Sequence, residues 1–455
     1  MTEPRTEQLM LEGWALRSRS VSVIMRPETR KILEALGDHF SDRSFIGRGG
    51  GASYGDAALN GNGVVAELDG LSGIIDFDTE QGIITCEPGI TMTALQAAVV
   101  PKGWFLPVAP GASQATVGGC VCFDVHGKNH EKQGTFGKNI VALRVLTADG
   151  NVRSCSQVDD ETLFWATVGG MGLTGLVVEV TLQLIPVESA FMTVSTSKTR
   201  NLEETFKAQE KSTAADYSVT WLDTTAGNKS LGRGIVMSAG HARVAELGPF
   251  QQKNALIWPE KQSRDIPFLP KRGLFRPLFV HAFNSVFYLK QRSVRRIQSA
   301  HPFLFPLHSI NNINRFYGKN GFFEYQVAVP DATAYALVHE MLSEVQRLRA
   351  GSFLTVLKRF GPHNPAPMSF PISGITLSMQ ILANDPEIPR MLDRFDIKTA
   401  EAGGRVYLAK DSRLLSGVID EMYPQRKTWA VFLDELDPNH VFASDMSRRL
   451  GLRNI

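Results

Sequence analysis

A chain of 455 residues is too long for one ordinary hydrophobic core and indicates two domains. Hydrophobic residues make up 43% and charged residues 21%, as is typical of a globular protein, and the formal net charge of +2 alone gives no indication of nucleic-acid binding. No window holds 18 uncharged apolar residues and the first 25 residues lack an apolar signal core, so we expect neither a transmembrane helix nor a signal peptide. We therefore expect a cytoplasmic protein, or one that is peripheral at the inner membrane.

Short apolar runs broken by glycine and aspartate dominate the N-terminal half and predict the strands of an open sheet. After a helix over 26–36, these strands are expected at 63–68, 73–77 and 82–87. A helix over 91–100 with Thr91 as its N-cap follows, and then a hairpin of strands 139–147 and 151–155, because Asp149-Gly150 tolerates positive φ. A capped helix over 160–167 and a strand over 175–184 complete this half.

The C-terminal half has a more regular pattern. A strand over 323–329 precedes a helix over 331–350, and strands over 352–360 and 375–383 flank a proline-rich loop. A second helix over 386–402 ends at two glycines, and a last strand is expected at 405–409. The order β-α-β-β-α-β is a split βαβ arrangement, which would form a separate antiparallel sheet with helices on one face. The fold class is therefore α+β.

A basic and aromatic segment lies between the halves, at about 251–300. It holds ten Lys and Arg residues against two Asp and Glu residues. Such a composition suits contact with anionic lipid headgroups. In the alternative, the aromatic side chains pack on the protein body and the basic ones are simply solvated. The aromatic residues are Phe268, Phe275, Phe279, Phe283, Phe287 and Tyr288.

A glycine-rich segment, Gly47-Arg48-Gly49-Gly50-Gly51-Ala52-Ser53-Tyr54-Gly55-Asp56, is the sharpest local feature. Its glycines leave amide N–H groups unobstructed and allow left-handed backbone, which is what main-chain binding of a diphosphate requires. It is not a Walker A loop, because the terminal Gly-Lys-Ser/Thr is absent. A surface turn is the alternative.

Three further patterns bear on cofactor or metal binding. In the segment 110–119, Thr116 is expected to cap a short helix whose N-terminus could face phosphate. The segment 170–175 matches GxGxxG but follows a helix and precedes a strand, the reverse of a dinucleotide-binding turn. His126 and His130 are four residues apart, but Gly127 weakens the helix that a metal pair would need, and no third ligand has suitable spacing. We expect no metal site.

The cysteines Cys86, Cys120, Cys122 and Cys155 form no CxxC pair, which favours reduced, buried thiols.

Three lysines carry the remaining chemical signal. Lys128 follows His126, and such a pair beside a redox ring could bind a substrate oxygen or stabilise negative charge. Lys410 follows Tyr407 at the end of the last predicted strand, where side chains are held by a rigid support. Lys358 lies on a central strand, and a buried lysine needs an anionic partner such as a flavin or a phosphorylated substrate. A solvated surface lysine is the alternative in each case.

A resemblance to a known family extends from about Gly47 to Leu450. The chain resembles FAD-linked oxidases of the vanillyl-alcohol oxidase type, with a PCMH-type FAD-binding fold like that of D-arabinono-1,4-lactone oxidases, and most closely the decaprenylphosphoryl-β-D-ribose 2′-oxidases. The resemblance is carried by the strings GRGGGASYGD, PGASQATVGG, HGKNH, FWATVGGMGLTG, LKRFGPHNPAPMSFPISG, RVYLAKDSR and VFASDMSRRL. It implies an FAD-binding domain over 1–190, a substrate or cap domain over 191–410 and a C-terminal segment, 411–455, that returns to the FAD-binding domain.

The resemblance also implies site residues. The implied catalytic residues are Lys410, His126, Tyr54 and Lys128. FAD would be bound by Gly47, Arg48, Gly49, Gly50, Gly51, Ala52, Ser53, Tyr54, Gly55, Asp56, Ala57, Gly111, Thr116, Val117, Gly118, Gly119, Phe123, Asp124, Val125, His126, Val177, Tyr407 and Lys410. The substrate would be bound by Trp221, Asn314, Arg315, Gln326, Lys358 and Ser378.

Departures from the family pattern occur at four positions. Relatives that attach FAD covalently have histidine where this chain has Ala52, which implies noncovalent FAD. Ser378 replaces a cysteine, Thr376 an asparagine and Glu324 a glutamine, so the edge of the substrate pocket is altered.

The resemblance implies oxidation of the 2′-hydroxyl of a polyprenyl-phosphoryl-β-D-ribose to the 2′-keto sugar. This is the first half of an epimerisation to the arabinose in cell-wall arabinan biosynthesis, which a separate short-chain keto-reductase would complete. A soluble alditol or aldonolactone oxidase is the second hypothesis, and a flavin-fold protein that acts only as a binding partner is the third. Peripheral membrane contact is expected, and nucleic-acid binding is not.

Overall fold

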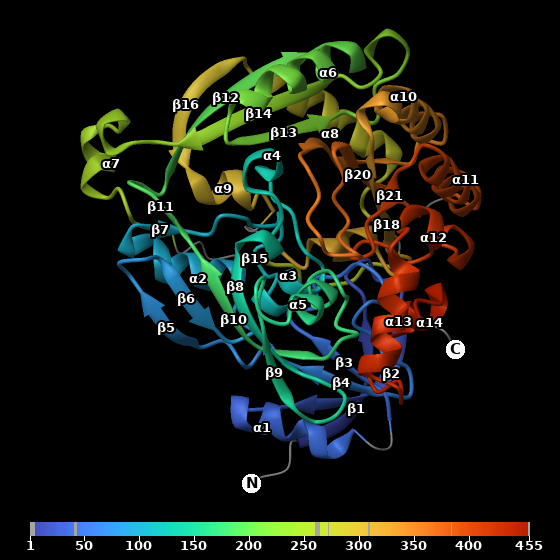
Figure 1. Ribbon diagram of the computed structural model, residues 1–455. Helices are drawn as coiled ribbons and strands as arrows, with labels where there is room; N and C mark the ends of the chain where they lie inside the picture. The colour runs from blue at the N-terminus through green and yellow to red at the C-terminus, as the bar shows by residue number, and fades with distance from the viewer. Residues whose placement is uncertain are drawn as a thin grey trace.

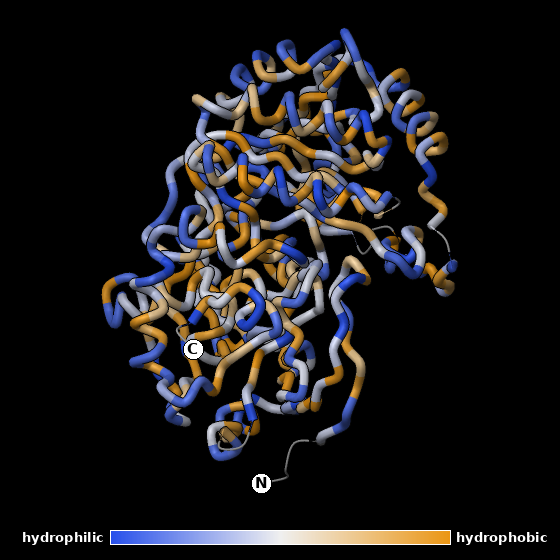
Figure 2. Tube along the Cα trace, turned by 90° about the vertical axis from the view of Figure 1, so that its right-hand side faces the viewer, coloured by the Kyte–Doolittle hydropathy of each residue, from blue (hydrophilic) through white to orange (hydrophobic). Residues whose placement is uncertain are grey.

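The computed structural model describes residues 5–40, 43–259, 264–271, 273–307, 310–383 and 385–453. Figure 1 shows the sheets of the N-terminal half below a larger sheet built from later parts of the chain, with the C-terminal helices along one side. Hydrophobic and hydrophilic residues alternate along most elements (Figure 2), as expected where each element has a buried and a solvated face. Within the described ranges, no helix combines the length and apolar character needed to cross a membrane.

A four-stranded sheet begins the fold. Its order is β1 (Arg5–Glu12), β2 (Arg19–Arg26), β4 (Val64–Glu67) and β3 (Phe45–Arg48), and β4 runs parallel to both β2 and β3. The glycine-rich segment therefore continues directly from the end of β3. The predicted helix over 26–36 is shorter than expected: β2 extends to Arg26, and α1 (Arg30–Glu34) begins only after Thr29, whose side chain caps it.

A five-stranded antiparallel sheet follows, in the order β5-β6-β10-β8-β9. Its strands are those expected from the sequence, and the β8–β9 hairpin turns at Gly150 with φ +78°. The predicted capping residues are also confirmed: Thr91 caps α2 (Met92–Val99) and Asp160 caps α5 (Glu161–Thr167). The strands are β5 (Ile74–Asp78), β6 (Ile83–Cys86), β8 (Ile140–Leu146), β9 (Val152–Cys155) and β10 (Leu176–Gln183).

The largest element is an eight-stranded sheet in the order β16-β12-β14-β13-β19-β20-β18-β21. The order of strands and helices expected from 323 onward is present, as β18 (Phe322–Val329), α10 (Asp331–Arg347), β19 (Gly351–Phe360), β20 (Gly374–Leu382), α11 (Glu387–Glu401) and β21 (Arg405–Val406). This antiparallel sheet contains no strand of the N-terminal half, but it is larger than the four strands expected, because β19 also pairs with β13 (Tyr217–Leu222). This pairing joins it to strands that the sequence did not reveal: β12 (Phe191–Thr199), β14 (Gly234–His241) and β16 (Val294–Ser299). β21 is also shorter than the predicted 405–409, because the chain turns at Tyr407, whose carbonyl accepts from Lys410 N.

One face of this sheet is covered by helices α6 (Leu202–Lys211), α10 and α11 (Figure 1). Tyr325 and Val327 on β18 pack into the core on that side. Glu324 and Gln326 alternate with them and line a cavity on the opposite face. The period of two in the strand thus separates core residues from candidate functional ones.

The basic and aromatic segment contains α7 (Pro249–Lys253), the two-residue strand β15 (Arg264–Asp265) and α8 (Pro277–Lys290). Phe275 packs against Phe353, Phe287 against Trp221, and the Tyr288 hydroxyl donates to the Thr199 carbonyl. Of the six aromatic residues named above for this segment, three do not pack in the protein body but are exposed: Phe268, Phe279 and Phe283.

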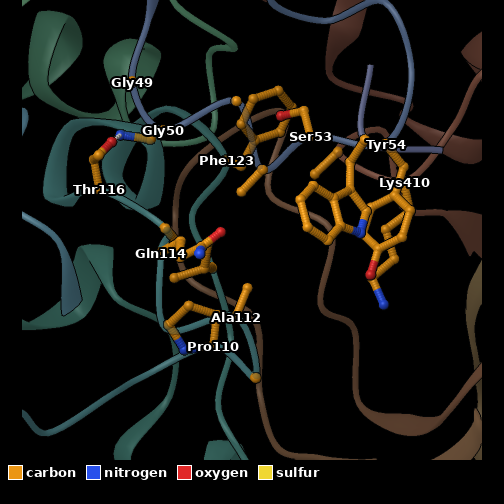
Figure 3. A pocket seen from close by; sticks show the side chains of 18 of the residues that line it. Gly49, Gly50, Ser53, Tyr54, Pro110, Ala112, Gln114, Thr116, Phe123 and Lys410 are labelled. Atoms are coloured by element: carbon orange, nitrogen blue, oxygen red, sulfur yellow. Dashed lines mark hydrogen bonds between the residues drawn. The ribbon is translucent and has the colours of Figure 1, made fainter. Parts of the chain in front are cut away.

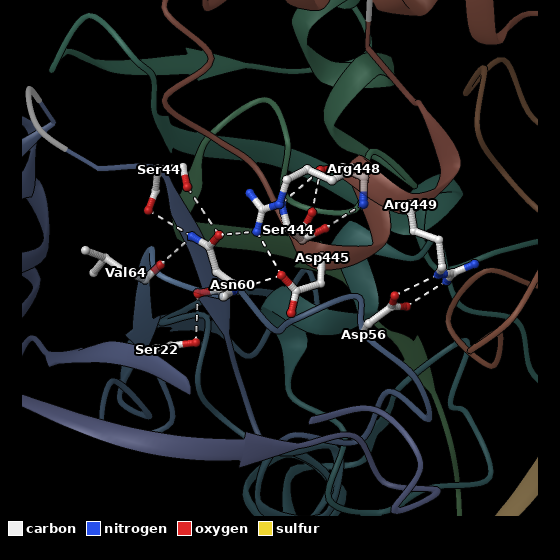
Figure 4. A network of polar contacts seen from close by, with 11 residues as sticks. Ser22, Ser44, Asp56, Asn60, Val64, Ser444, Asp445, Arg448 and Arg449 are labelled. Carbon is white, nitrogen blue, oxygen red and sulfur yellow. Dashed lines mark hydrogen bonds and ion pairs between the residues drawn. The ribbon is translucent and has the colours of Figure 1, made fainter. Parts of the chain in front are cut away.

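The C-terminal segment returns to the N-terminal sheets. Helices α13 (Arg426–Leu436) and α14 (Asp445–Leu450) lie along that side of the molecule (Figure 1). In Figure 4, Arg449 makes a two-point ion pair with Asp56, at 2.7 and 2.8 Å, and Arg448 donates to Asn60. Arg449 also pairs with Asp411, so one guanidinium ties the end of the glycine-rich segment to the residue after Lys410.

All four cysteines are free, as the sequence predicts. Cys86, Cys120 and Cys155 are buried and Cys122 is half-buried. Burial raises the pKa of Cys86 and of Cys122 to about 12, so these thiols stay protonated and unreactive at neutral pH.

Candidate active site

A cavity of about 350 Å³ lies where the two N-terminal sheets meet the inner face of the eight-stranded sheet. Its size is within the range of small-molecule sites. Figure 3 shows its two walls: the glycine-rich segment with the 110–116 loop on one side, and Tyr54 with Lys410 on the other.

The glycine-rich segment forms a backbone cradle. Among the described residues, none accepts a hydrogen bond from the amide N–H groups of 49–53. Gly51 has a φ of +62°, a conformation that favours glycine. A run of unpaired amides in a concave wall is an anion-binding arrangement, so the cradle suits a diphosphate.

The opposite loop approaches the cradle closely. A Cβ added to Gly49 would lie 2.0 Å from Thr116 Oγ1, and one added to Gly50 would lie 2.5 Å from the Gln114 carbonyl oxygen. Thr116 caps α3 (Val117–Cys122), as predicted, by accepting from Gly119 N at 3.3 Å. Only glycine fits where these two loops meet, whereas Gly111 has open space around it.

A hydrogen-bonded cluster around Lys410 occupies the other wall. Lys410 Nζ lies 3.0 Å from Glu324 Oε1 and 2.9 Å from Ser378 Oγ, and Ser378 donates to the same Glu324 oxygen at 2.6 Å. The ammonium also lies 5.4 Å from the centre of the Tyr54 ring. Burial, together with Glu324, raises the pKa of the Tyr54 hydroxyl well above its usual value, so this hydroxyl stays protonated.

His126 is held as a neutral ring. Gln326 Nε2 donates to His126 Nε2 at 3.0 Å, which leaves the ring proton on Nδ1. Burial, and then the charges of Lys358, His130 and Lys410, holds the pKa of His126 well below its usual value. The ring packs among Phe360, Phe370 and Tyr407.

Two further lysines line the same cavity. Lys128 Nζ donates to the carbonyls of Phe303 and Leu304, at the end of α9 (Ala300–Leu304). Burial lowers the pKa of Lys128 to about 7, and burial with Lys410 and Lys128 as neighbours lowers the pKa of Lys358 to about 7. Among the described residues that line the cavity, Glu324 is the single carboxylate against Lys128, Lys358, Lys410 and Arg48. The cavity therefore favours anionic occupants.

Most residues of the predicted site are brought together here. Those that line the cavity are Gly47, Arg48, Gly49, Gly50, Gly51, Ala52, Ser53, Tyr54, Ala57, Gly111, Thr116, Gly118, Gly119, Phe123, Val125, His126, Lys128, Val177, Asn314, Gln326, Lys358, Ser378, Tyr407 and Lys410.

Six predicted residues lie outside the lining. Asp56 pairs with Arg449, Gly55 packs against the Asp411 carbonyl, and Val117 faces the core. Asp124 is fully buried and accepts from Gly137 N and Asn364 Nδ2. Trp221 Nε1 donates to the Phe353 carbonyl, and Arg315 donates to the Ile266 carbonyl. Both side chains therefore lie behind the cavity wall and support it.

The chain is similar to flavoproteins over most of its length. Residues 22–156 match the FAD binding domain family. Decaprenylphosphoryl-beta-D-ribose oxidase of Mycolicibacterium smegmatis is 35% identical over 99% of this chain and 99% of its own length. The chain belongs to the decaprenylphosphoryl-β-D-ribose oxidase family. It is thus an FAD-dependent oxidoreductase of the vanillyl-alcohol oxidase type.

More distant relatives of the chain have names that describe lactone oxidation. L-gulono-1,4-lactone dehydrogenase of Mycobacterium tuberculosis is 22% identical over 88% of the chain and 89% of its own length. L-gulonolactone oxidase of Mus musculus is 30% identical over 36% of the chain and 37% of its own length.

The cavity fits FAD on the chemistry of its walls. The unpaired amides of 49–53 suit the diphosphate, and the close approach of Gly49 and Gly50 to the 110–116 loop leaves no room for side chains there. Lys410, beside Tyr54, supplies a cation of the kind that stabilises a reduced, anionic flavin ring.

Sequence reasoning missed several lining residues. From the sequence Glu324 is only a departure from the family pattern, whereas in the structure its carboxylate accepts from both Lys410 and Ser378. Met171, Gly172 and Gly175 of the GxGxxG-like segment also line the cavity, although that segment is no dinucleotide-binding turn. The signal in the sequence was that this glycine-rich segment directly precedes β10. Among the described residues, no group of three or more His, Cys, Asp or Glu is arranged to hold a metal ion.

Proposed function

We propose that the protein oxidises the 2′-hydroxyl of a polyprenyl-phosphoryl-β-D-ribose to the 2′-keto sugar, as the first half of an epimerisation to the arabinose. The similarity to a decaprenylphosphoryl-β-D-ribose oxidase over nearly the whole chain carries this proposal. A separate short-chain keto-reductase would then reduce the ketone on the other face.

We propose noncovalent FAD, held through the diphosphate by the 49–53 amides and through the ring by residues near Tyr54, Tyr407 and Lys410. Ala52, in the cradle, offers no nucleophile for a covalent bond. When bound, FAD accepts the hydride that leaves the sugar carbon. Lys410 would hold its ammonium toward the ring, and Glu324 and Ser378 are positioning residues for that ammonium.

Lys128 and Lys358 are proposed to bind the anionic phosphate of the substrate. Both lie in the cavity, and neither pairs with a carboxylate among the described residues. His126, neutral and hydrogen-bonded to Gln326 through Nε2, would pack beneath the reacting groups. Its Nδ1–H would donate to a sugar oxygen. Trp221 and Arg315 would support the substrate wall from behind, and Asn314 would line it.

The domain division proposed from the sequence places FAD binding in 1–190 and substrate binding in 191–410, with 411–455 returning to the first domain. The strands of the eight-stranded sheet, from Phe191 to Val406, support this division. We also propose peripheral contact with a membrane through the 251–300 segment, since a polyprenyl substrate is delivered in lipid.

Stopped-flow reduction of the flavin tests the proposed function. Purified protein is mixed with short-chain prenyl-phosphoryl pentoses, free alditols and aldonolactones, and the loss of flavin absorbance is followed. Rapid bleaching by the phosphorylated ribose alone is expected. Faster bleaching by free alditols or lactones would favour the soluble sugar oxidase, and no bleaching by any alcohol would favour a binding protein.

A further inference from the structure

The exposed face of α8 is apolar, the reverse of a normal surface helix. Leu278 is 84% exposed and Leu289 is 71% exposed. Phe279, Phe283 and Val286 lie on the same side of the helix and are 43–54% exposed. At 100° per residue these five side chains lie within an arc of about 140°, which Lys290 interrupts only at the last residue of the helix.

The opposite face of α8 fixes the helix to the protein body. Val280 and Asn284 are buried, and Asn284 Nδ2 donates to Asp223 Oδ1 at 3.1 Å. Phe287 packs edge-on against Trp221, with ring centres 4.8 Å apart. Because these contacts hold the helix firmly, its apolar stripe is a stable feature of the surface.

α8 also packs on the wall of the cavity. The Phe283 and Phe353 rings lie 6.0 Å apart, and Phe275, just before α8, lies 4.8 Å from Phe353. Phe353 and its neighbour Leu354 line the cavity. Further apolar residues of that wall continue along the 306–313 stretch: Pro306, Leu307, Ile310 and Ile313.

The charge around this stripe is of one sign. From Ile266 to Ala300 the sequence contains no Asp or Glu. Exposed basic residues lie before α8, at its last residue and after it: Lys271, Arg276, Lys290, Arg292, Arg295 and Arg296. An apolar helix face bordered by cations is complementary to an anionic lipid bilayer.

We propose that α8 is a membrane-docking helix, whose Leu278–Leu289 stripe enters the interfacial region of an anionic bilayer and turns the cavity wall at Phe353 toward the lipid. The proposal rests on the proposed function for its substrate: a polyprenyl chain would leave the bilayer along Phe353, Leu354 and Leu307 to bring the phosphate to Lys358. A second copy of the chain fits this face less well, because a symmetric contact would bring the two sets of basic residues together.

Vesicle co-sedimentation tests the docking helix. The FAD-loaded protein is mixed with vesicles of phosphatidylglycerol and phosphatidylcholine, or of phosphatidylcholine alone. Wild type is expected to bind the anionic vesicles, and the triple variant Leu278→Ser, Phe279→Ser, Leu289→Ser to bind them at least about tenfold more weakly, since burying one leucine is worth roughly that factor. The matched control, Val158→Ser, Ile397→Ser, Val431→Ser, changes exposed apolar residues elsewhere and should bind as wild type.

Unchanged vesicle binding by the α8 triple variant would overturn the proposal. So would a dimeric wild type that the triple variant converts to monomer in analytical ultracentrifugation, because the stripe would then bind a second copy. The variant Arg292→Gln, Arg295→Gln, Arg296→Gln should weaken binding to anionic vesicles and remove much of its salt dependence.

Flavin reduction in solution separates this proposal from the proposed function. With a short-chain prenyl-phosphoryl ribose and no vesicles, the α8 triple variant should bleach at the wild-type rate, because none of its changed residues lines the cavity. If no phosphorylated ribose bleaches either protein while vesicle binding still depends on α8, the docking helix stands and the proposed substrate fails. Slow bleaching by the triple variant alone would contradict a role confined to docking.

Discussion

Backbone amides form one end of the cavity, whereas charged side chains form the other. The cradle of 49–53 comes from one continuous segment and depends on the absence of side chains. The Lys410 cluster joins residues from β18, β20 and the turn after β21, which are far apart in the sequence. Ligand binding at the first end should therefore be sensitive to steric change, and chemistry at the second end to changes of charge.

The largest effect is expected from Gly49→Val. The new side chain would overlap Thr116 Oγ1 and close the cradle, so the protein should fold but lose nearly all bound FAD. The ratio of flavin to protein absorbance measures this loss, and circular dichroism checks the fold. Gly417→Val, with no atom within 4 Å of the added Cβ and outside the cavity lining, is the matched control and should keep its FAD. A yellow Gly49→Val protein would show that the cradle does not hold the cofactor.

At the charged end, Lys410→Ala should leave FAD bound but slow flavin reduction by about 10²- to 10³-fold, the usual cost of removing one electrostatic stabiliser of a transition state. Stopped-flow reduction under anaerobic conditions measures the rate. Replacing the exposed Lys207 by Ala is the control for loss of a positive charge. Reduction at the wild-type rate would remove Lys410 from the chemistry.

Glu324→Gln tests the electrostatics of the charged end, because it removes a negative charge and keeps the shape of the side chain. The Lys410 ammonium would then act on the ring without a compensating carboxylate, so the flavin potential should rise and sulfite should bind roughly tenfold more tightly. Sulfite titration and a redox titration provide the readouts. Ser378→Ala keeps the charge of Glu324 and should change both quantities less. A lower potential in Glu324→Gln would contradict this electrostatic account.

The smallest effect concerns pH. The pKa of Lys358 is lowered to about 7, so its charge is present below pH 7 and is lost as the pH rises above it. Binding of a prenyl-phosphoryl ligand should weaken above pH 7, by up to about tenfold per unit. Calorimetry from pH 6 to 8.5 measures the slope, and Lys358→Met should flatten it in part, since the pKa of Lys128 is also about 7. A pH-independent affinity in wild type would exclude lysine titration from phosphate binding.

The same contrast explains what the sequence could predict. The cradle could be expected because its glycines are adjacent in the chain, and the caps Thr91, Thr116 and Asp160 because capping is local. The joining of β13 to β19 depends on a pairing between distant strands, which no local pattern encodes. For the same reason the contact of Glu324 with Lys410 could not be foreseen, and the exposed stripe of α8 could not be distinguished from a buried one.

We propose that the glycine cradle and the Lys410 wall enclose a noncovalently bound FAD. The absorption spectrum of the purified, folded chain before and after acid precipitation tests this directly. We expect a flavin spectrum with an equimolar amount of FAD, and complete release of the yellow colour into the acid supernatant. A folded protein that is colourless and cannot be reconstituted with FAD would contradict the claim, and colour retained in the pellet would contradict its noncovalent part.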